Sequence, residues 1–401
     1  MSLGELVRTR AATVPETAGS PLVAVYRQPA PVFIGGVGSY LIDDQGERYL
    51  DFTSGIGVNA LGHGHATIAH AIQRSLDTGL VHTSNLFRTK PATDLAGWLV
   101  EHSFADAVFF SNSGAEANEA ALKFARRWAT AAYGPERTEI VALRGGFHGR
   151  TMGALSLTDR VAYQAPFAPL LGATRIAELD ADAIAEIVDP ARTAAVIIEP
   201  IQGEGGVRPV PPKTLRALRD ACDRADALLI FDEVQVGLGR TGRLWAHEWS
   251  GVTPDVMTLA KPLAGGLPMG ATLVTAAVAK SIQPGDHGST FGGGPLVAGV
   301  ALAVCRHVAE PAFLADVRTK GARVAQRLEA IVRAGRARDA RGSGLLWGLD
   351  VATPAADVVA RALDAGLLLC SAGPDVVRLG PPLNVADEDL ETGLDLLEES
   401  L

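Results

Sequence analysis

The chain has 401 residues, of which 47% are hydrophobic and 20% charged, an ordinary globular composition with room for two domains. Its 36 basic and 45 acidic residues give a formal net charge of −9, which argues against a broad nucleic-acid footprint or an anionic membrane surface. We find no signal-type apolar run near the N-terminus and no stretch of about 18 apolar residues, and the three cysteines are far apart. We therefore expect a cytoplasmic protein with no membrane and no nucleic-acid partner.

The N-terminal part of the chain is expected to form an arm and a β-hairpin. Residues 1–35 are rich in proline and alanine and have weak periodicity. Residues 39–52 contain two alternating apolar runs around Asp44-Gln45-Gly46, which is the pattern of a hairpin. We expect residues 1–58 to pack, as this arm and hairpin, with a small C-terminal domain.

From about residue 60, helical patterns alternate with short apolar segments. The expected strands are 107–111, 139–143, 194–200, 227–233, 256–260 and 271–277. Near-continuous apolar strands separated by helices predict a mostly parallel sheet covered by helices on both faces. We expect an α/β fold with a large domain over 59–294. A long apolar linking helix and a smaller α+β domain would cover 295–401.

The stretch 228–242 contains three glycines in the spacing G-x-G-x-x-G, behind an apolar strand. A dinucleotide-binding turn needs its first glycine directly at the strand end, but here Asp232 and Gln235 intervene. Asp255 follows as an acid, so a nicotinamide site stays a weak alternative. A poorly solvated Asp232 at the sheet edge needs a cationic partner, such as the protonated pyridine nitrogen of pyridoxal phosphate. An aspartate that caps a loop is the other possibility.

Lys261 leaves the apolar strand 256–260 and enters a glycine-rich loop. Burial at that place would lower the pKa of the amine and make it a nucleophile toward an aldehyde. A solvated surface lysine remains the alternative. The following Pro262 is expected to restrict Lys261 to extended backbone.

A helix is predicted to open at Ser113-Gly114-Ala115, directly after the strand 107–111. The free N–H groups and the dipole at a helix N-terminus make an anion site, to which Ser113 adds a hydroxyl. Ser113 and Glu116 also have the spacing of a capping box, and the two interpretations are compatible.

Polar side chains follow other expected strands as well. Phe147 could stack on a flat heteroaromatic ring and Arg150 could pair with a carboxylate, although a core aromatic and a surface arginine would look alike. Glu199 and Glu204 place two carboxylates at another strand end. Arg378 is a lone arginine in an apolar run, so it needs an acidic partner or an anionic ligand if it is buried.

The sequence gives little support for a metal site. His63 and His65 lie close together, but no carboxylate or cysteine is near them in sequence. The segment 247–249 has a histidine and a glutamate without the second histidine of a zinc-protease motif. We expect no metal.

The order of these motifs resembles the class III aminotransferases of the acetylornithine aminotransferase group, within the fold-type I pyridoxal-phosphate enzymes. The matching stretches span nearly the whole chain: GIGVNALGHGH, HTSNLF, NSGAEANEAALKFAR, GGFHGRT, EPIQGEGGV, DEVQVGLGRTG, LAKPLAGGLPMGA, GSTFGGGPLVA and VVRLGPPLN. Two positions depart from the family pattern. Pro262 replaces a small residue, and Gly294 stands where the family usually has asparagine, which could loosen the turn after Thr290.

The resemblance implies how the cofactor, pyridoxal 5'-phosphate, would be held. Lys261 would bond to the cofactor aldehyde as a Schiff base and later move a proton between substrate and cofactor carbons. Asp232 would pair with the pyridine nitrogen, and Gln235 with the ring hydroxyl. The ring would lie between Phe147 and Val234. The phosphate would be held by Ser113, Gly114 and Ala115 and, from the neighbouring subunit of a homodimer, by Ser289 and Thr290.

The resemblance also implies how substrates would bind. Arg378 would take the α-carboxylate of glutamate or 2-oxoglutarate, and Glu204 would pair with Arg378 when an ω-amine is bound. Arg150 would hold the substrate's other carboxylate. A movable ion pair would let one site accept both substrates.

The implied reaction moves the ω-amino group of N2-acetylornithine to 2-oxoglutarate by a ping-pong mechanism. The products would be N-acetylglutamate 5-semialdehyde and glutamate, and the pathway arginine biosynthesis. Aminotransferases of ornithine, succinylornithine, 4-aminobutyrate or carrier-linked lysine remain open, although a net charge of −9 weakly disfavours an acidic carrier. Outside this group, an aminomutase or racemase on the same cofactor and a nicotinamide-dependent oxidoreductase remain open.

Overall fold

A seven-stranded sheet forms the centre of the computed structural model, which describes residues 22–23, 25–26, 29–179 and 184–401. Its strand order is β4-β12-β11-β10-β7-β5-β6. The strands are β4 (Ala107–Ser111), β5 (Glu139–Leu143), β6 (Thr174–Ala177), β7 (Thr193–Ile198), β10 (Leu228–Asp232), β11 (Val256–Leu259) and β12 (Gly270–Val274). Among them β12 alone runs opposite to the other six strands. The expected α/β fold with a mostly parallel sheet is confirmed, and each predicted strand is present; β6 was not predicted.

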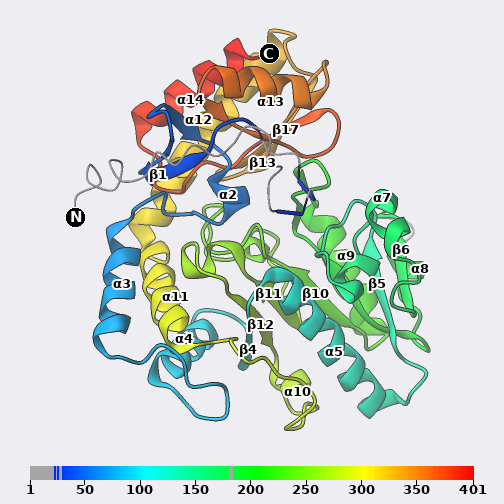
Figure 1. The fold of residues 1–401 in the computed structure, drawn as a ribbon. Helices are drawn as coiled ribbons and strands as arrows, with labels where there is room; N and C mark the ends of the chain where they lie inside the picture. The colour runs from blue at the N-terminus through cyan, green and yellow to red at the C-terminus, as the bar shows by residue number, and fades with distance from the viewer. Residues whose placement is uncertain (1–21, 24, 27–28, 180–183) are drawn as a thin grey trace.

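Helices cover both faces of this sheet (Figure 1). They are α3 (Ala66–Asp77), α4 (Lys90–Glu101), α5 (Gly114–Tyr133), α6 (Met152–Ser156), α7 (Val161–Gln164), α8 (Ile184–Ile187), α9 (Pro212–Arg224) and α10 (Ala276–Ala279). Alternate residues of a strand point to opposite faces. In β10, Leu228 and Ile230 therefore pack in the cluster that contains α5, whereas Leu229 and Phe231 pack in the cluster that contains α9.

The N-terminal hairpin joins a second sheet, of order β1-β2-β3-β15. Its strands are β1 (Phe33–Val37), β2 (Tyr40–Asp43), β3 (Arg48–Asp51) and β15 (Leu367–Leu368), and β2 and β3 form the predicted hairpin. Because β15 belongs to the C-terminal part of the chain, its parallel pairing with β3 ties the two ends together. The Tyr40 hydroxyl adds a 2.7 Å hydrogen bond to Asp389. Most of the expected arm lies outside the described residues.

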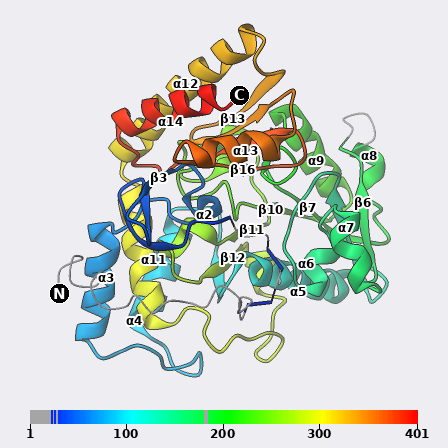
Figure 2. The same cartoon turned by 45° about the horizontal axis from the view of Figure 1, so that its top comes forward.

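The C-terminal part begins with the predicted linking helix, α11 (Pro295–Val308), which packs on α3 and α4 (Figure 1). The elements after it are α12 (Pro311–Arg333), β13 (Asp339–Ser343), β14 (Leu346–Asp350), α13 (Ala355–Asp364), β16 (Cys370–Ser371), β17 (Val376–Leu379) and α14 (Asp387–Glu399). Its sheet has the order β13-β14-β17-β16, and α12 and α14 lie side by side (Figure 2). No single described helix is long and apolar enough to cross a membrane; α11 and α12 qualify only as a pair bent by 66°.

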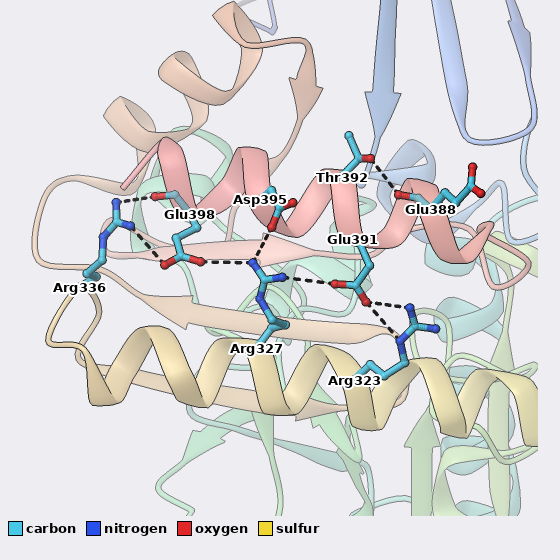
Figure 3. Close-up of polar contacts among 8 residues, drawn as sticks. All are labelled: Arg323, Arg327, Arg336, Glu388, Glu391, Thr392, Asp395 and Glu398. Atoms are coloured by element: carbon cyan, nitrogen blue, oxygen red, sulfur yellow. Dashed lines mark hydrogen bonds and ion pairs between the residues drawn. The ribbon is translucent and has the colours of Figure 1, made fainter.

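Charged side chains join α12 to α14 across their exposed surfaces (Figure 3). Arg327 reaches Glu391, Asp395 and Glu398 at 3.3, 2.7 and 3.2 Å. Arg323 and Arg336 continue the row of ion pairs on either side. These groups are partly solvated, so the network contributes modestly to stability and is weakened by salt.

Candidate active site

A cavity of about 450 Å³ opens at the carboxyl edge of the large sheet. The strands β4, β5, β7, β10 and β11 run in one direction, so the loops that follow them meet at this edge, the usual ligand crevice of α/β folds. Ten of the predicted site residues line the cavity: Ser113, Gly114, Ala115, Phe147, Arg150, Glu204, Asp232, Val234, Gln235 and Lys261. Of the others, Arg378 lines an adjoining small cavity, and Ser289 and Thr290 lie elsewhere.

Asp232 is the last residue of β10 and is 4% exposed. His148 Nδ1 and Asn118 Nδ2 lie 2.8 and 2.7 Å from its Oδ2 atom, and the Val234 amide donates to Oδ1 at 3.0 Å. Asn118 is fixed in turn because its Oδ1 accepts a 2.7 Å hydrogen bond from the Thr258 hydroxyl. The carboxylate is therefore held rigidly at the cavity wall, where a cationic ring nitrogen would complete its bonding.

Sequence reasoning missed His148 and Asn118. Both are buried, and they come from elements far from Asp232 in the chain. His148 Nε2 has no hydrogen-bond partner among the described residues. The only available signal was a histidine directly after a candidate ring-stacking phenylalanine.

Lys261 begins a short 3₁₀ helix, η3 (Lys261–Ala264), directly after β11. Burial lowers the pKa of its amine, and the nearby Arg378 lowers it further, against the opposing carboxylates Glu204, Asp232 and Glu199. A lower pKa shifts the amine toward its neutral, nucleophilic form. The expectation of extended backbone is wrong: Lys261 has φ of +23°, a strained value for a residue other than glycine. Tertiary structure outweighs the influence of Pro262.

The N-terminus of α5 faces the cavity. Ser113 is the N-cap, and its hydroxyl accepts a 3.2 Å bond from the Glu116 amide. The Glu116 carboxylate accepts from the Asn112 amide at 2.5 Å instead of from Ser113, so half of the predicted capping box forms. A Cβ added to Gly114 would lie 2.6 Å from Val234 Cγ1, so the close approach of these two loops requires glycine. Among the described residues the amides of Gly114 and Ala115 have no hydrogen-bond partner, so they can bind an anion.

Arg378 and Glu204 form an ion pair at the cavity, with Nη1 and Oε1 2.5 Å apart. The Arg378 side chain is 5% exposed and the Glu204 side chain 30% exposed. Arg378 Nη1 also lies 3.4 Å from Gln235 Oε1, and its Nε lies 3.3 Å from Cys370 Sγ. The buried arginine thus has the acidic partner that its position in an apolar strand demanded.

Arg150 lies at the cavity mouth and is exposed. Its guanidinium carbon stands 3.4 Å from the centre of the Tyr163 ring and 5.8 Å from that of Phe147. Within the described part of the chain no acid pairs with it, so its N–H groups remain available to a carboxylate.

Ser289 and Thr290 do not reach the cavity within one chain. The Ser289 hydroxyl lies 3.2 Å from Asn112 Nδ2 and accepts from the Gly292 amide at 3.0 Å. Thr290 lines a separate cavity of about 530 Å³ that is bordered by residues 82–89.

The weak alternatives have structural explanations. No α-helix begins at Gly242, as a dinucleotide-binding turn would require; the next helical element is the short 3₁₀ helix η2 (Ala246–Trp249). The three glycines therefore form a tight loop, and the dinucleotide interpretation is wrong. His63 pairs with Asp51 at 3.0 Å, and His65 caps α3. Gly294 is the N-cap of α11 with φ of −50°, a conformation open to any residue. The turn that follows Thr290 is closed by a 3.0 Å bond from the Gly294 amide to Phe291.

Comparison with known proteins places this site in a family. Residues 24–401 match the model of the class-III aminotransferases. A mitochondrial acetylornithine aminotransferase of Alnus glutinosa is 47% identical over 97% of this chain and 87% of its own length. A succinylornithine transaminase of Salmonella paratyphi A is 45% identical over 93% of both proteins. The ornithine aminotransferase of Toxoplasma gondii, solved with partial occupancy of pyridoxal phosphate, aligns with a TM-score of 0.89 and 31% identity, over 95% of this chain and 91% of that one.

The chain belongs to the class-III aminotransferases. It is an aminotransferase of fold-type I, and its cofactor is pyridoxal phosphate. The residues present fit this cofactor. The N-terminus of α5 offers amides for the phosphate, and Gly114 leaves room for Val234, which a larger residue would displace. Asp232 is a fixed, buried carboxylate, and Lys261 is an amine whose pKa is lowered.

Proposed function

We propose that the protein moves the ω-amino group of N2-acetylornithine to 2-oxoglutarate, giving N-acetylglutamate 5-semialdehyde and glutamate, in arginine biosynthesis. The observation that carries this proposal is the Arg378–Glu204 ion pair beside Lys261. The names of the relatives support the choice of amine, although a succinylornithine transaminase, at 45% identity, is as similar as acetylornithine enzymes at 47 and 44%. Succinylornithine, ornithine, 4-aminobutyrate and carrier-linked lysine therefore stay as alternatives within the family.

Bound pyridoxal phosphate supplies an electron sink for the carbon that carries the amino group. We propose that Asp232 holds the proton on the pyridine nitrogen, oriented by His148 and Asn118. Phe147 and Val234 would enclose the ring, and Gln235 would bond its hydroxyl. The phosphate would bind Ser113, Gly114 and Ala115 at the N-terminus of α5.

Lys261 has two tasks in this proposal. Its neutral amine attaches the cofactor between turnovers, and after release it moves a proton at the substrate carbon. Burial supports both tasks, because it lowers the pKa of the amine toward the working pH.

The ion pair between Arg378 and Glu204 explains how one site takes two different substrates. With an ω-amine bound, Glu204 neutralises Arg378, and the uncharged acyl end meets no unpaired cation. With glutamate or 2-oxoglutarate bound, Glu204 moves away and Arg378 binds the carboxylate. Glu204 is able to leave because its carboxylate is partly exposed, whereas Arg378 is fixed in β17. Arg150 would hold the other carboxylate at the cavity mouth.

We further propose that the active enzyme is a homodimer in which Ser289 and Thr290 complete the phosphate site of the other subunit. Thr290 is exposed in one chain and lies away from the cavity. Near it, Leu86, Phe87 and Phe291 are 86, 71 and 67% exposed, which is unusual for a solvated surface. If sites are shared, mixing inactive Lys261→Ala chains with inactive Thr290→Arg chains will restore part of the activity.

We propose that the chain divides into domains at residues 1–58, 59–294 and 295–401. We also propose that the protein is located in the cytoplasm. The pairing of β3 with β15 supports grouping the N-terminal hairpin with the C-terminal part. The buried free thiols of Cys222 and Cys305 fit a reducing compartment. Limited proteolysis and cell fractionation test these two proposals.

The test of function compares kcat/KM for N2-acetylornithine, succinylornithine, ornithine and 4-aminobutyrate, each with 2-oxoglutarate. The proposal predicts the highest value for N2-acetylornithine. A higher kcat/KM for another amine would make that amine the substrate. Movement of the amino group within the amine, in the absence of 2-oxoglutarate, would indicate an aminomutase.

A further inference from the structure

Glu199 is a buried carboxylate that the proposed chemistry leaves without a task. It directly follows β7 and is 6% exposed. Its Oε1 atom accepts a 2.8 Å hydrogen bond from the Phe147 amide, and its Oε2 atom accepts a 3.0 Å hydrogen bond from the Gly203 amide. One carboxylate therefore holds two loops that are more than fifty residues apart in sequence, and each of its oxygens holds one of them.

The two loops carry different parts of the site. The first places Phe147 at the cavity where the cofactor ring is expected. The second contains Glu204, the partner of Arg378, in the residue after Gly203. Gly203 also packs tightly against Gln235, since an added Cβ would lie within 2 Å of that side chain. Glu204 is thus preceded by a fixed residue and followed by Gly205 and Gly206, the second of which has φ of +104°.

This geometry makes Gly203 the natural pivot for a movement of Glu204. The Glu199 carboxylate holds the chain at Gly203, and Arg160 Nη2 donates a 2.6 Å hydrogen bond to the Glu204 carbonyl, so the Glu204 side chain turns about a backbone that is fixed on both sides. Loss of the bond at Gly203 would free the pivot and loosen the Arg378–Glu204 pair. Loss of the bond at Phe147 would free the aromatic ring.

We propose that Glu199 is a positioning residue that couples the Phe147 loop to the Glu204 loop, so that cofactor binding and the exchange of Glu204 for a substrate dicarboxylate both respond to this carboxylate. Gln202 Nε2, which donates to the Arg144 carbonyl at 2.7 Å, adds a neutral link between the same loops. The second half of this proposal rests on the proposed function of Arg378 and Glu204. The first half rests on the two hydrogen bonds alone.

The charge state of Glu199 adds a pH dependence that can be measured. Burial raises its pKa to about 7; the nearby Asp232 carboxylate raises it as well, whereas His148 and the two amide bonds lower it. Lys261 also faces the group, and its pKa is lowered by burial. Below about pH 7 the protonated carboxyl keeps only part of its acceptor strength, so both loops loosen as the pH falls.

The first test replaces Glu199 by glutamine, which keeps the size but turns an NH₂ group toward one backbone N–H. The matched control is Asp159→Asn, because the Asp159 carboxylate holds the Gly145 amide at 2.8 Å in the same loop as Phe147 and does not bond the Gly203 loop. The measurements are the dissociation constants of pyridoxal phosphate from the apoenzyme and of glutarate, an unreactive dicarboxylate, from the holoenzyme.

We expect Glu199→Gln to bind the cofactor about tenfold more weakly and glutarate several-fold more tightly, because a hydrogen bond to a charged group is lost and Glu204 competes less well for Arg378. Its KM for the amine rises while its KM for 2-oxoglutarate falls. In Asp159→Asn the cofactor is bound more weakly and glutarate as in the wild type. Unchanged glutarate binding in Glu199→Gln, or both effects in the control, would overturn the coupling.

A second measurement needs no variant. In the wild-type holoenzyme labelled with ¹⁵N-phenylalanine and ¹⁵N-glycine, the amide resonances of Phe147 and Gly203 are expected to shift with one common midpoint near pH 7. Different midpoints, or no shift between pH 6 and 8, would refute the inference. If the wild type binds no glutarate, the proposed role of Arg378 fails. The pH midpoints of the Phe147 and Gly203 amide resonances still decide whether Glu199 couples the two loops.

Discussion

Replacing Glu204 by glutamine is expected to affect the two halves of the reaction in opposite directions. A fully buried ion pair costs about 3–5 kcal/mol to break, and an exposed one about 0–1 kcal/mol. The Arg378 side chain is 5% exposed but that of Glu204 is 30% exposed, so we place the effect at about 1–2 kcal/mol, or about 5- to 30-fold. The KM for 2-oxoglutarate falls by this factor because its carboxylate no longer displaces Glu204. The KM for the amine rises because the acyl end meets an unpaired guanidinium.

Stopped-flow absorbance of the bound cofactor separates these half-reactions, with the amine mixed in one experiment and 2-oxoglutarate in the other. Glu398→Gln is a suitable control, because that glutamate pairs with Arg327 and Arg336 on the distant surface of α14. An equal loss in both half-reactions of Glu204→Gln would show that Glu204 does not act as a movable partner of Arg378.

Three further changes test separate parts of the structure. Gly114→Ala places a methyl group against Val234 and is expected to weaken cofactor binding at least tenfold in a fluorescence titration. The control is Gly97→Ala, on the exposed face of α4, where a methyl group has space and raises the free energy of unfolding by about 0.5–1 kcal/mol. Gly294→Asn supplies a side-chain cap to α11 and raises the free energy of unfolding by a few tenths of a kcal/mol, and Tm with it, without a change in KM; a lower Tm would refute the assignment of this N-cap. Arg327→Ala lowers the free energy of unfolding by about 1 kcal/mol in low salt, and a difference that persists in 1 M NaCl would contradict a solvated network.

The sequence predicts the large sheet well because its strands are short, apolar on both faces and separated by amphipathic helices. The segment 139–143 is an example: all five of its residues are buried in β5. The edge strand β6, Thr174–Ala177, was not predicted, because it is half-exposed and has no such apolar run. Site residues at strand ends could be located for the same reason, since parallel strands deliver their carboxyl ends to one edge.

Contacts between distant segments could not be predicted from local patterns. Asn118 is a polar residue inside an amphipathic helix, a pattern that predicts an exposed side chain. In the structure it is buried and donates a hydrogen bond to Asp232. The positive φ of Lys261 opposes the local influence of Pro262 and is imposed by the packing around η3. The two backbone partners of Glu199 likewise follow only from the folded positions of two loops.

We propose that the cofactor is carried by Lys261, which follows β11 and whose amine has a lowered pKa. Borohydride treatment of the holoenzyme, followed by peptide mass mapping, fixes and locates any lysine that has bonded to the cofactor aldehyde. The account predicts a single modified peptide, containing Lys261, and no modified peptide in Lys261→Ala. Modification of another lysine, such as the buried Lys320 that pairs with Asp316 on α12, would contradict the account, as would a modified peptide in the variant.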